Sequence, residues 1–505
     1  MAAIDAKDRP DFKCAAYTRQ MPALELVSDV LADTESVKAK TTKYLPKGPL
    51  ESRAAYDSRL NIAALFPATK RTWSGFLGLL FKKPPVFGED VPPEIAGSEG
   101  AEGWIENIDN AGTHANEFIK EFAGNALAHG HAVILVDMPR AVEREDGMAP
   151  TLEDEKRAGI RPFWVNLTKR QIINWQEEQR DGQTVLTLVM IEECLMVPDG
   201  RFGEKEKKQY REFRDDNGVI TVQLWEKAET GKGSQEEFIP IGAAISISNQ
   251  TEIPIAVAYG HKLGTLQSAP PLLGLAEENL RHYRLRTNHE KMTMLSFPVI
   301  VSKGQVRNLN VPEGNKQDLA FSPDEILEID ATPDTNAFLL EPAGTGIAPL
   351  AQEIKDSESR MARLGLSMLE PAQQSGKTTT EAAGDQIEEQ SELDFFKASV
   401  QDAVELALMF TAKFVGLPTG GSFKLESALS KFKLSVEKIK VFSDMVERSQ
   451  FDVEDLLTLL KQADELPDDF DIEAAVKKLT AAKEKAAERE VSLFNRGGLP
   501  VEDGA

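Results

Sequence analysis

The stretch Pro270–Pro298, "PPLLGLAEENLRHYRLRTNHEKMTMLSFP", predicts one long amphipathic helix. Apolar and small residues recur at intervals of three and four and form one stripe, namely Leu273, Ala276, Leu280, Tyr283, Thr287 and Met294. The charged residues Glu277, Glu278, Arg281, Arg284, Arg286 and Lys291 lie off that stripe. Prolines bound the pattern at both ends, and at 1.5 Å per residue the helix would form a rod of about 39 Å.

A second helical rod follows after a short insert. Residues 297–348 carry the turn signals "PEGN", "SPDE" and "TPDT" between short apolar runs, which is typical of strands joined by turns. Residues 349–369, "PLAQEIKDSESRMARLGLSML", return to helical spacing, with a stripe through Leu350, Ile354, Met361, Leu364 and Met368. We therefore expect two rods, 271–296 and 349–369, on either side of a small β-containing insert.

Upstream of the first rod, the pattern is first helical and then rich in strands. Helical spacing extends from Pro22 to about Pro85, and a further helix is predicted over 113–128. Between His131 and Gly260, runs such as "HAVILVDMP", "TVLTLVMIEECLMV", "GVITVQLW" and "IPIAVAYG" are rich in Val, Ile and Thr and are bounded by Gly, Pro and Asp. The alternation of Ile220, Val222 and Leu224 with polar residues indicates a strand with one buried face. The fold class expected from this order is α+β.

Downstream of the second rod, the phrase "SGKTTTE" raises the question of nucleotide binding. A phosphate-binding loop needs a glycine five positions before the Gly-Lys pair, but Pro371 stands there, and the preceding element is a predicted helix rather than a strand. Thr378 and Glu381 instead fit a capping box at the start of a helix.

That helix is expected over 379–417. Its stripe passes through Ala383, Ile387, Phe396, Val400, Ala403, Val404, Ala407 and Phe414, and Gly416 followed by Pro418 is a typical stop signal. From there to about Arg489, helical stripes alternate with the acidic turn "DELPDDFD".

We find no pattern that predicts catalysis, a cofactor or a metal. His129 and His131 would share one face if the strand included both, but no third ligand accompanies them, so ordinary hydrogen bonding is expected. His282 and His289, on the first rod, are expected at solvated or inter-subunit positions. Ser367 lacks the glycine pattern of a nucleophile elbow.

Composition excludes several classes of protein. The 505 residues include 82 acids against 58 Lys and Arg, a net charge of −24, which disfavours a protein that wraps nucleic acid tightly. No run approaches the ~20 apolar residues of a membrane span, and the first residues do not resemble a secretion signal. Cys14 and Cys194 are too few for a disulfide framework or a cysteine metal site, so a reducing compartment is expected.

The order of these elements resembles that of the portal proteins of tailed bacteriophages. Local phrases are similar to one portal family, long catalogued as a domain of unknown function: "VKAKTTKYLPKG", "YDSRLNIAALFPATKRTWSGFLGLLFKKPP", "HGHAVILVDMP", "RPFWVNLTKRQIINW", "PPLLGLAEENLRHYR", "TTTEAAGDQIEEQSEL" and "ELPDDFDIE". They occur in family order from about Val37 to Glu473. Where the family often has Thr-Ala-Thr-Glu, this chain has Thr378, Thr379, Thr380 and Glu381, a change that preserves the capping chemistry.

The resemblance implies the portal fold, an α+β fold with a β-rich wing, a two-helix stem, a small α/β clip, a long helix and an α-helical crown. The corresponding segments would be an N-terminal arm (1–21), the wing (22–270), a stem helix (271–296), the clip (297–348), a second stem helix (349–369), a tunnel loop (370–378), a long wing-to-crown helix (379–417), and the crown with the C-terminal tail (418–505).

The function implied is a ring, typically of twelve subunits, at one capsid vertex of the virion, assembled in the host cytoplasm. Double-stranded DNA would pass through its channel without sequence-specific contacts, and the partners would be the terminase large subunit, the major capsid and scaffolding proteins, and head-tail adaptor or tail proteins, with no membrane. The portal itself would hydrolyse nothing. The loop residues Gln373, Gln374, Ser375, Gly376 and Lys377 are expected near the DNA. The alternatives are another head-tail connector or capsid-associated protein, and a nucleotide-dependent enzyme using Lys377.

Overall fold

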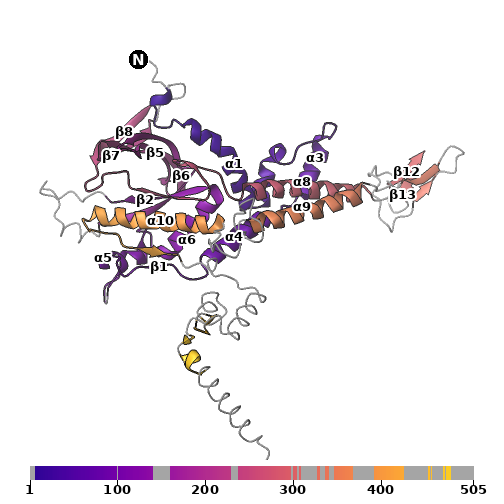
Figure 1. The fold of residues 1–505 in the computed structure, drawn as a ribbon. Coiled ribbons are helices and arrows are strands. Elements are labelled where there is room, and N and C mark those ends of the chain that lie inside the picture. Colours follow the sequence, from indigo (N-terminus) through magenta and orange to yellow (C-terminus); the bar gives the residue numbers. More distant parts are fainter. Residues whose placement is uncertain are drawn as a thin grey trace, which may run out of the picture. The chain divides into compact units, whose positions relative to one another are not determined.

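The computed structural model describes most of the chain in ten stretches and four short pieces. These are residues 6–98, 100–139, 160–228, 237–296, 299–303, 306–308, 327–329, 336–340, 346–367 and 392–425, and then 453–454, 456–457, 470–472 and 474–478. Residues 1–425 form one compact unit and residues 426–505 a second. The fold class is α+β, as predicted, because helices and antiparallel sheets occupy separate stretches of the chain (Figure 1).

The chain begins with helices. They are α1 (Ala15–Ala32), α2 (Thr34–Ala39), α3 (Arg53–Ile62), α4 (Ala68–Leu80), α5 (Pro93–Ala96) and α6 (Ala115–His129), with short 3-10 turns at Ala6–Asp8, Thr41–Lys43 and Trp104–Asn107. The break between α3 and α4 contains Pro67, which precedes the first residue of α4. The predicted helix over 113–128 is confirmed as α6.

Two antiparallel sheets follow. The first has three strands in the order β3-β2-β9, and the second has five in the order β4-β5-β6-β7-β8. The strands are β2 (His131–Asp137), β3 (Phe163–Thr168), β4 (Ile172–Arg180), β5 (Gln183–Asp199), β6 (Gly203–Asp216), β7 (Val219–Lys227), β8 (Phe238–Ser246) and β9 (Ile255–Tyr259), with a small pair β10 (Lys262–Gly264) and β11 (Gln267–Ser268).

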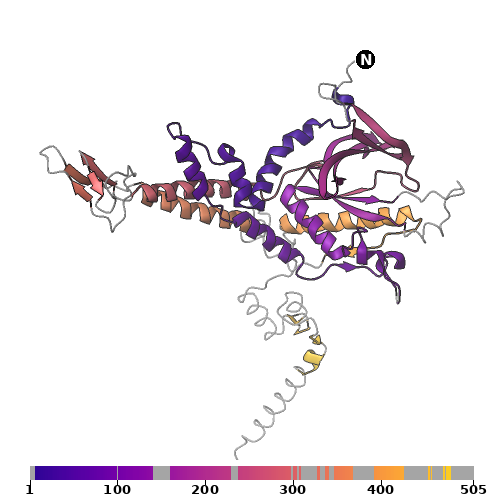
Figure 2. The ribbon, with the colours of Figure 1, turned by 180° about the vertical axis from the view of Figure 1, so that it is seen from behind.

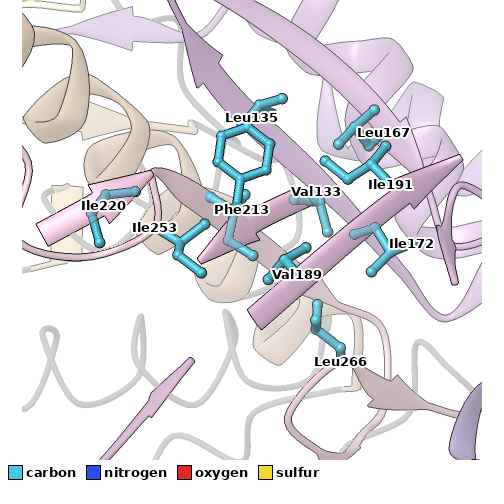
Figure 3. Close-up of a cluster of buried hydrophobic side chains, with 11 residues drawn as sticks. Val133, Leu135, Leu167, Ile172, Val189, Ile191, Phe213, Ile220, Ile253 and Leu266 are labelled. Carbon is cyan, nitrogen blue, oxygen red and sulfur yellow. The ribbon is translucent and has the colours of Figure 1, made fainter. Parts of the chain in front are cut away.

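An apolar core joins the two sheets. Figure 3 shows side chains from both sheets meeting in one cluster, among them Val133 of β2, Leu167 of β3, Val189 of β5 and Phe213 of β6. All of these are buried almost completely, and each large apolar side chain removed from water contributes roughly 1.5–3 kcal/mol. Two of the three predicted inward positions of β7 are confirmed, since Ile220 belongs to the core and Val222 packs against it, whereas Leu224 is half-buried outside this cluster.

Strand β6 was not predicted, because its sequence, "GEKEKKQYREFRDD", is mostly charged. It nevertheless lies in the interior of the five-stranded sheet, paired with β5 on one side and β7 on the other. Its basic side chains meet acids of β5: Lys208 Nζ lies 2.6 Å from Glu192 Oε1, and Arg211 Nε lies 2.9 Å from Glu193 Oε1. Cross-strand pairing therefore supplies partners that the local sequence alone does not reveal.

Helix α1 begins earlier than predicted. The expected N-terminal arm ended at residue 21, but Pro22 lies inside α1. The Cys14 Sγ accepts a hydrogen bond from Tyr17 N at 3.4 Å where the helix begins, and Tyr17 packs against Ile173 and Met190 of the five-stranded sheet. A proline in a helix loses one backbone hydrogen bond, and here the burial of the residues on both sides of it offsets that loss.

After the sheets come two long helices separated by small strands. They are α8 (Leu273–Leu295) and α9 (Ile347–Ser367), which confirm the two predicted rods as helices. Between them, β12 (Val299–Lys303) pairs with β15 (Asn336–Leu340), and β13 (Val306–Asn308) pairs with β14 (Leu327–Ile329). The insert therefore contains strands, as its turn signals indicated.

Helix α10 (Glu392–Phe414) is buried against the three-stranded sheet and α6. The predicted stripe is confirmed at the described positions Phe396, Val400, Ala403, Val404 and Ala407, whereas residues 379–391 of the predicted helix lie outside the described residues. Helices α6 and α10 pack on the three-stranded sheet, where Trp164 of β3 contacts Phe118 and donates a hydrogen bond to Thr411 Oγ1 at 2.8 Å. This face is opposite the one that meets the five-stranded sheet, so the layers are helices, sheet and sheet (Figure 2).

The end of α10 has the geometry that its sequence predicted. Gly416 adopts a φ of 73°, its N–H bonds Lys413 O at 3.1 Å, and Leu417 N–H bonds Ala412 O at 2.9 Å, which together make a Schellman motif. The chain then forms β16 (Phe423–Lys424), which pairs with β1 (Val86–Phe87). The first unit therefore continues to Leu425.

The described residues of the second unit are few. Residues 453–454, 456–457, 472 and 474–478 are helical. The Asp471 carboxylate accepts a hydrogen bond from Ala474 N at 3.0 Å, as an N-terminal cap does, directly after the acidic turn. The helical character expected after "DELPDDFD" is therefore present in these residues.

Candidate functional site: the helix pair α8–α9 and its anchors

Helices α8 and α9 run antiparallel and in close contact. Gly274, near the start of α8, lies beside Leu364, near the end of α9, whereas Met292, near the end of α8, lies beside Gly346, just before α9. The chain thus travels out along one helix, through the small strands, and back along the other. This arrangement holds the insert between the ends of a two-helix rod.

Charged side chains fix how the two helices align. Glu278 of α8 accepts hydrogen bonds from Ser357 Oγ at 2.6 Å and Arg360 Nε at 3.0 Å. Glu353 of α9 accepts from Arg281 at 2.6 Å and from Arg360 at 3.1 Å. The carboxylates of Glu278 and Glu353 raise the pKa of Arg360, because they favour its charged form. Polar pairs of this kind select one register over its neighbours more than they add stability.

A buried ion cluster anchors the far half of α8 to the N-terminal helices. Arg59 of α3 donates to Glu51 at 2.9 and 2.8 Å, and Lys291 of α8 donates to the same carboxylate at 2.8 Å. The side chains of Arg59 and Glu51 are only 7% and 8% exposed. Hydrogen bonds from Arg59, then from Lys291, hold the pKa of Glu51 well below its usual range.

A second anchor connects α8 with the start of α4. The side-chain oxygen of Asn279 accepts from Thr69 N at 3.2 Å and Thr69 Oγ1 at 2.9 Å, and its nitrogen donates to Phe66 O at 2.8 Å. Asn279 is fully buried, and its amide acts as the cap that Pro67 cannot provide. One side of α8 is therefore buried by contacts within the chain.

His282 also lies on the buried side of α8, which corrects the expectation of a solvated or inter-subunit position. It is 1% exposed, packs against the Phe66 ring, and has Nε2 at 3.4 Å from Glu358 Oε1. Burial lowers the pKa of His282, and Glu358 opposes that shift only in part. The sequence did not indicate this burial, because Phe66, which covers His282, is more than two hundred positions away in the chain.

Apolar side chains remain exposed near the ends of the pair. Ala276, Leu280, Tyr283 and Thr287 of the predicted stripe are buried, whereas Met294, at the end of the same stripe, is 57% exposed. Met292 and Leu364 are each 40% exposed. Lys291 still forms an ion pair with Glu51, whereas Met294, three residues farther along α8, is mostly exposed. None of the helices that the structure describes combines the length and apolar character needed to cross a membrane.

The predicted loop and cap residues cannot be located. Gln373, Gln374, Ser375, Gly376, Lys377, Thr378 and Glu381 all belong to residues 368–391, which lie outside the described residues. This segment joins the end of α9 at Ser367 to the start of α10 at Glu392. The channel loop and the capping box therefore stay predictions.

The histidine pair near β2 does not share a strand face. His129 is the last residue of α6 and His131 the first of β2, with Gly130 between them at a φ of 93°. Across the described residues, no group of three or more His, Cys, Asp or Glu side chains is arranged to hold a metal ion.

His131 belongs instead to a buried polar cluster that the sequence did not indicate. Its Nδ1 lies 2.8 Å from Ser268 Oγ, and Lys169 Nζ donates to Ser268 O at 2.8 Å and to its Oγ at 3.2 Å. Burial lowers the pKa of His131 to about 3 and that of Lys169 to about 8. Ser268 N also donates to Gln20 Oε1 at 2.9 Å, so the cluster ties α1 and both sheets to the segment that leads into α8.

Comparisons with known proteins cover the helix pair and the chain as a whole. Residues 271–415 match the family model described as "Domain of unknown function (DUF4055)", which spans α8, the small strands, α9 and α10. No curated protein matches the chain. A solved structure described as "Neck of native GTA particle computed with C12 symmetry" is similar with a TM-score of 0.33 and 9% sequence identity, over 82% of this chain and 94% of that one.

Proposed function

We propose that the chain is the portal subunit of a tailed bacteriophage, which assembles with further copies into a ring at one capsid vertex. The ring, typically of twelve subunits in the family that the sequence resembles, would conduct double-stranded DNA during packaging and ejection. It would dock the terminase large subunit, capsid and scaffolding proteins, and adaptor or tail proteins. In this role the protein is a structural component of the virion and not an enzyme.

The observation that carries the proposal is the antiparallel pair α8–α9 with small strands inserted between its helices. This is the stem and clip order that the resemblance implies, and it follows an α+β unit of the kind expected for the wing. One side of α8 is buried on the N-terminal helices, while Met292 and Met294 remain exposed on a helix that is otherwise rich in charge. Apolar side chains exposed at the end of a rod are suited to contacts between neighbouring subunits.

The charge balance is compatible with a channel. A net charge of −24 disfavours strong binding of a polyanion, since tight DNA binding requires many cationic contacts with phosphate. A duct must let DNA slide rather than hold it. Lys377 and its neighbours in the predicted loop would then supply weak, sequence-independent contacts with phosphates.

The test is the assembly state of the purified protein. Mass measurement in solution and negative-stain imaging are expected to reveal rings with a central hole, and a stable monomer under all conditions would overturn the proposal. A solid or open assembly without a channel would favour another head-tail connector or capsid-associated protein.

The enzyme alternative has its own readout. ATP hydrolysis by the purified protein that is abolished by Lys377→Ala would favour a nucleotide-dependent enzyme, with Lys355→Ala, at an exposed lysine of α9, as the control. We expect no hydrolysis in either variant.

The channel loop can be tested separately. Deletion of residues 372–376 is expected to leave the ring intact and to impair DNA packaging or retention in assembled particles. Unchanged packaging and retention would contradict the role assigned to the loop.

A further inference from the structure

Strands β5 and β6 extend beyond the sheet as a two-stranded ribbon. Residues Cys194–Asp199 of β5 and Gly203–Lys208 of β6 pair only with each other, because the pairing with β4 and β7 ends before them. At about 3.3 Å per residue the ribbon projects by roughly 20 Å. An isolated two-stranded ribbon is marginally stable in water, so one of this length gains from a contact at its tip.

The tip of the ribbon presents one aromatic and one cationic side chain. Phe202 is 90% exposed, and Arg201 stacks on it with Cζ 4.9 Å from the ring centroid. Gly200, at a φ of 77°, provides the turn that places both at the end of the hairpin. Farther back on the ribbon, Met196 and Leu195 are 63% and 41% exposed. The ribbon thus ends in a knob with an apolar body and a positive charge.

A cavity of about 840 Å³ lies elsewhere in the same unit, where α10 and α8 begin. Its walls include Phe395, Phe396, Pro270 and Pro271, and Phe395 is 59% exposed. Glu392 and Asp402 of α10 contribute carboxylates, and no hydrogen bond or ion pair joins either of them to another described residue. The basic side chains at the cavity are His261 and Lys262, and Lys262 is already stacked on the Tyr259 ring at 5.0 Å.

The knob and the cavity are complementary in apolar character and in charge. The exposed Phe202 ring matches the apolar wall of the cavity, and Arg201 would meet Glu392 and Asp402, two carboxylates that have no partner among the described residues. Neither Arg201 nor Phe202 lines the cavity, so the two features do not meet within one chain. We infer that the β5–β6 tip of one copy inserts into the cavity between α8 and α10 of the next copy.

This contact is heterologous, because two different surfaces of the same chain are joined. Repetition of a heterologous contact produces a closed ring when the rotation between copies closes. The inference rests on the proposed function, since it assigns the residues by which adjacent portal subunits hold each other outside the helix pair. Aromatic and arginine side chains buried in desolvated pockets also contribute most of the binding energy at many protein interfaces.

The first experiment measures ring assembly as a function of protein concentration for single variants. Phe202→Asp is expected to raise the protein concentration needed for assembly by at least about tenfold, because the variant loses the free energy gained by burying one phenylalanine ring. Phe202→Tyr keeps the ring of the side chain and serves as the matched control, with little change expected. Arg201→Glu should weaken assembly, and Arg201→Glu combined with Asp402→Arg should restore it. All these residues are exposed, so circular dichroism of each variant should match that of the unchanged protein.

The second experiment tests the pairing directly. In a chain with Cys194→Ser and Cys14→Ser, cysteines introduced by Phe202→Cys and Ala398→Cys should crosslink adjacent copies. A heterologous contact predicts a ladder of covalent oligomers on a denaturing gel, and each single-cysteine variant should give no ladder.

Rings that form normally with Phe202→Asp, and a paired-cysteine protein that gives no ladder, would overturn this inference and leave the proposed function intact. If the unchanged protein forms no ring at all, the proposed function falls, and this contact falls with it. A ladder that stops at the dimer would indicate a symmetric contact and would also contradict the arrangement proposed here.

Discussion

Helix α10 and the pair α8–α9 are similar in length but are held in the fold by different physical means. Ten residues of α10 are buried, nearly all of them apolar, and it lies against the three-stranded sheet and α6. Helix α8 is buried on one side only, where Ala276, Leu280 and Tyr283 pack in an apolar cluster with the N-terminal helices. Buried polar groups at Asn279, His282 and the Glu51 ion cluster add to this packing. Helix α10 is therefore held almost entirely by apolar burial, whereas α8 combines one apolar side with buried polar anchors and keeps its other side exposed.

Two adjacent phenylalanines of α10 should give the largest contrast. Phe396→Ala removes a fully buried ring and is expected to lower the free energy of unfolding by about 3–5 kcal/mol. Phe395→Ala removes a ring that is 59% exposed and should change the free energy of unfolding by less than about 0.5 kcal/mol. Urea unfolding followed by tryptophan fluorescence measures both. Equal losses would mean that α10 is not packed as described.

The anchor of α8 should give the next largest effect. Glu51→Gln leaves the buried Arg59 without its carboxylate partner, and loss of one partner of a buried pair costs roughly 3 kcal/mol. Asp57→Asn, in the exposed Arg53–Asp57 pair, is the matched control and should cost less than about 0.5 kcal/mol. If the two variants unfold at the same urea concentration, the Glu51 cluster does not anchor the helix.

Acid should remove the contribution of Glu51. Its pKa is depressed in the folded protein, so the stabilisation is complete above the ordinary glutamate value near 4.3 and decreases as the pH falls toward the folded value. The difference in unfolding free energy between the unchanged protein and Glu51→Gln should therefore be constant from about pH 7 to 5 and shrink below about pH 4. A difference that grows on acidification would contradict the ion cluster.

The polar contacts between α8 and α9 should give the smallest effects. Glu278 is 13% exposed and accepts two hydrogen bonds, so Glu278→Gln is expected to cost about 1 kcal/mol. Arg281 is 52% exposed, and Arg281→Ala should cost no more than about 0.5 kcal/mol in the isolated chain. Thermal unfolding of the two variants gives the ranking, and the reverse order would mean that Arg281 is covered by another subunit.

Elements with clear local signals could be predicted from the amino-acid sequence. The stripe of α10, the glycine stop at Gly416 and the alternation in β7 were all readable, because periodicity and turn chemistry depend on neighbours in the chain. The two rods and the strands between them were readable for the same reason, and with them the resemblance that led to the proposed function.

Features that depend on residues far apart in the chain could not be predicted in this way and became visible in the folded structure. The charged strand β6 exists because β5 and β7 pair with it, and α1 continues through Pro22 because the five-stranded sheet receives Tyr17. The Lys169–Ser268–His131 cluster joins residues more than ninety positions apart, a separation that no local spacing can encode. Burial is a property of the whole fold, so the sequence could predict which faces are apolar but not which of them, as at Met294 and Phe202, would remain uncovered.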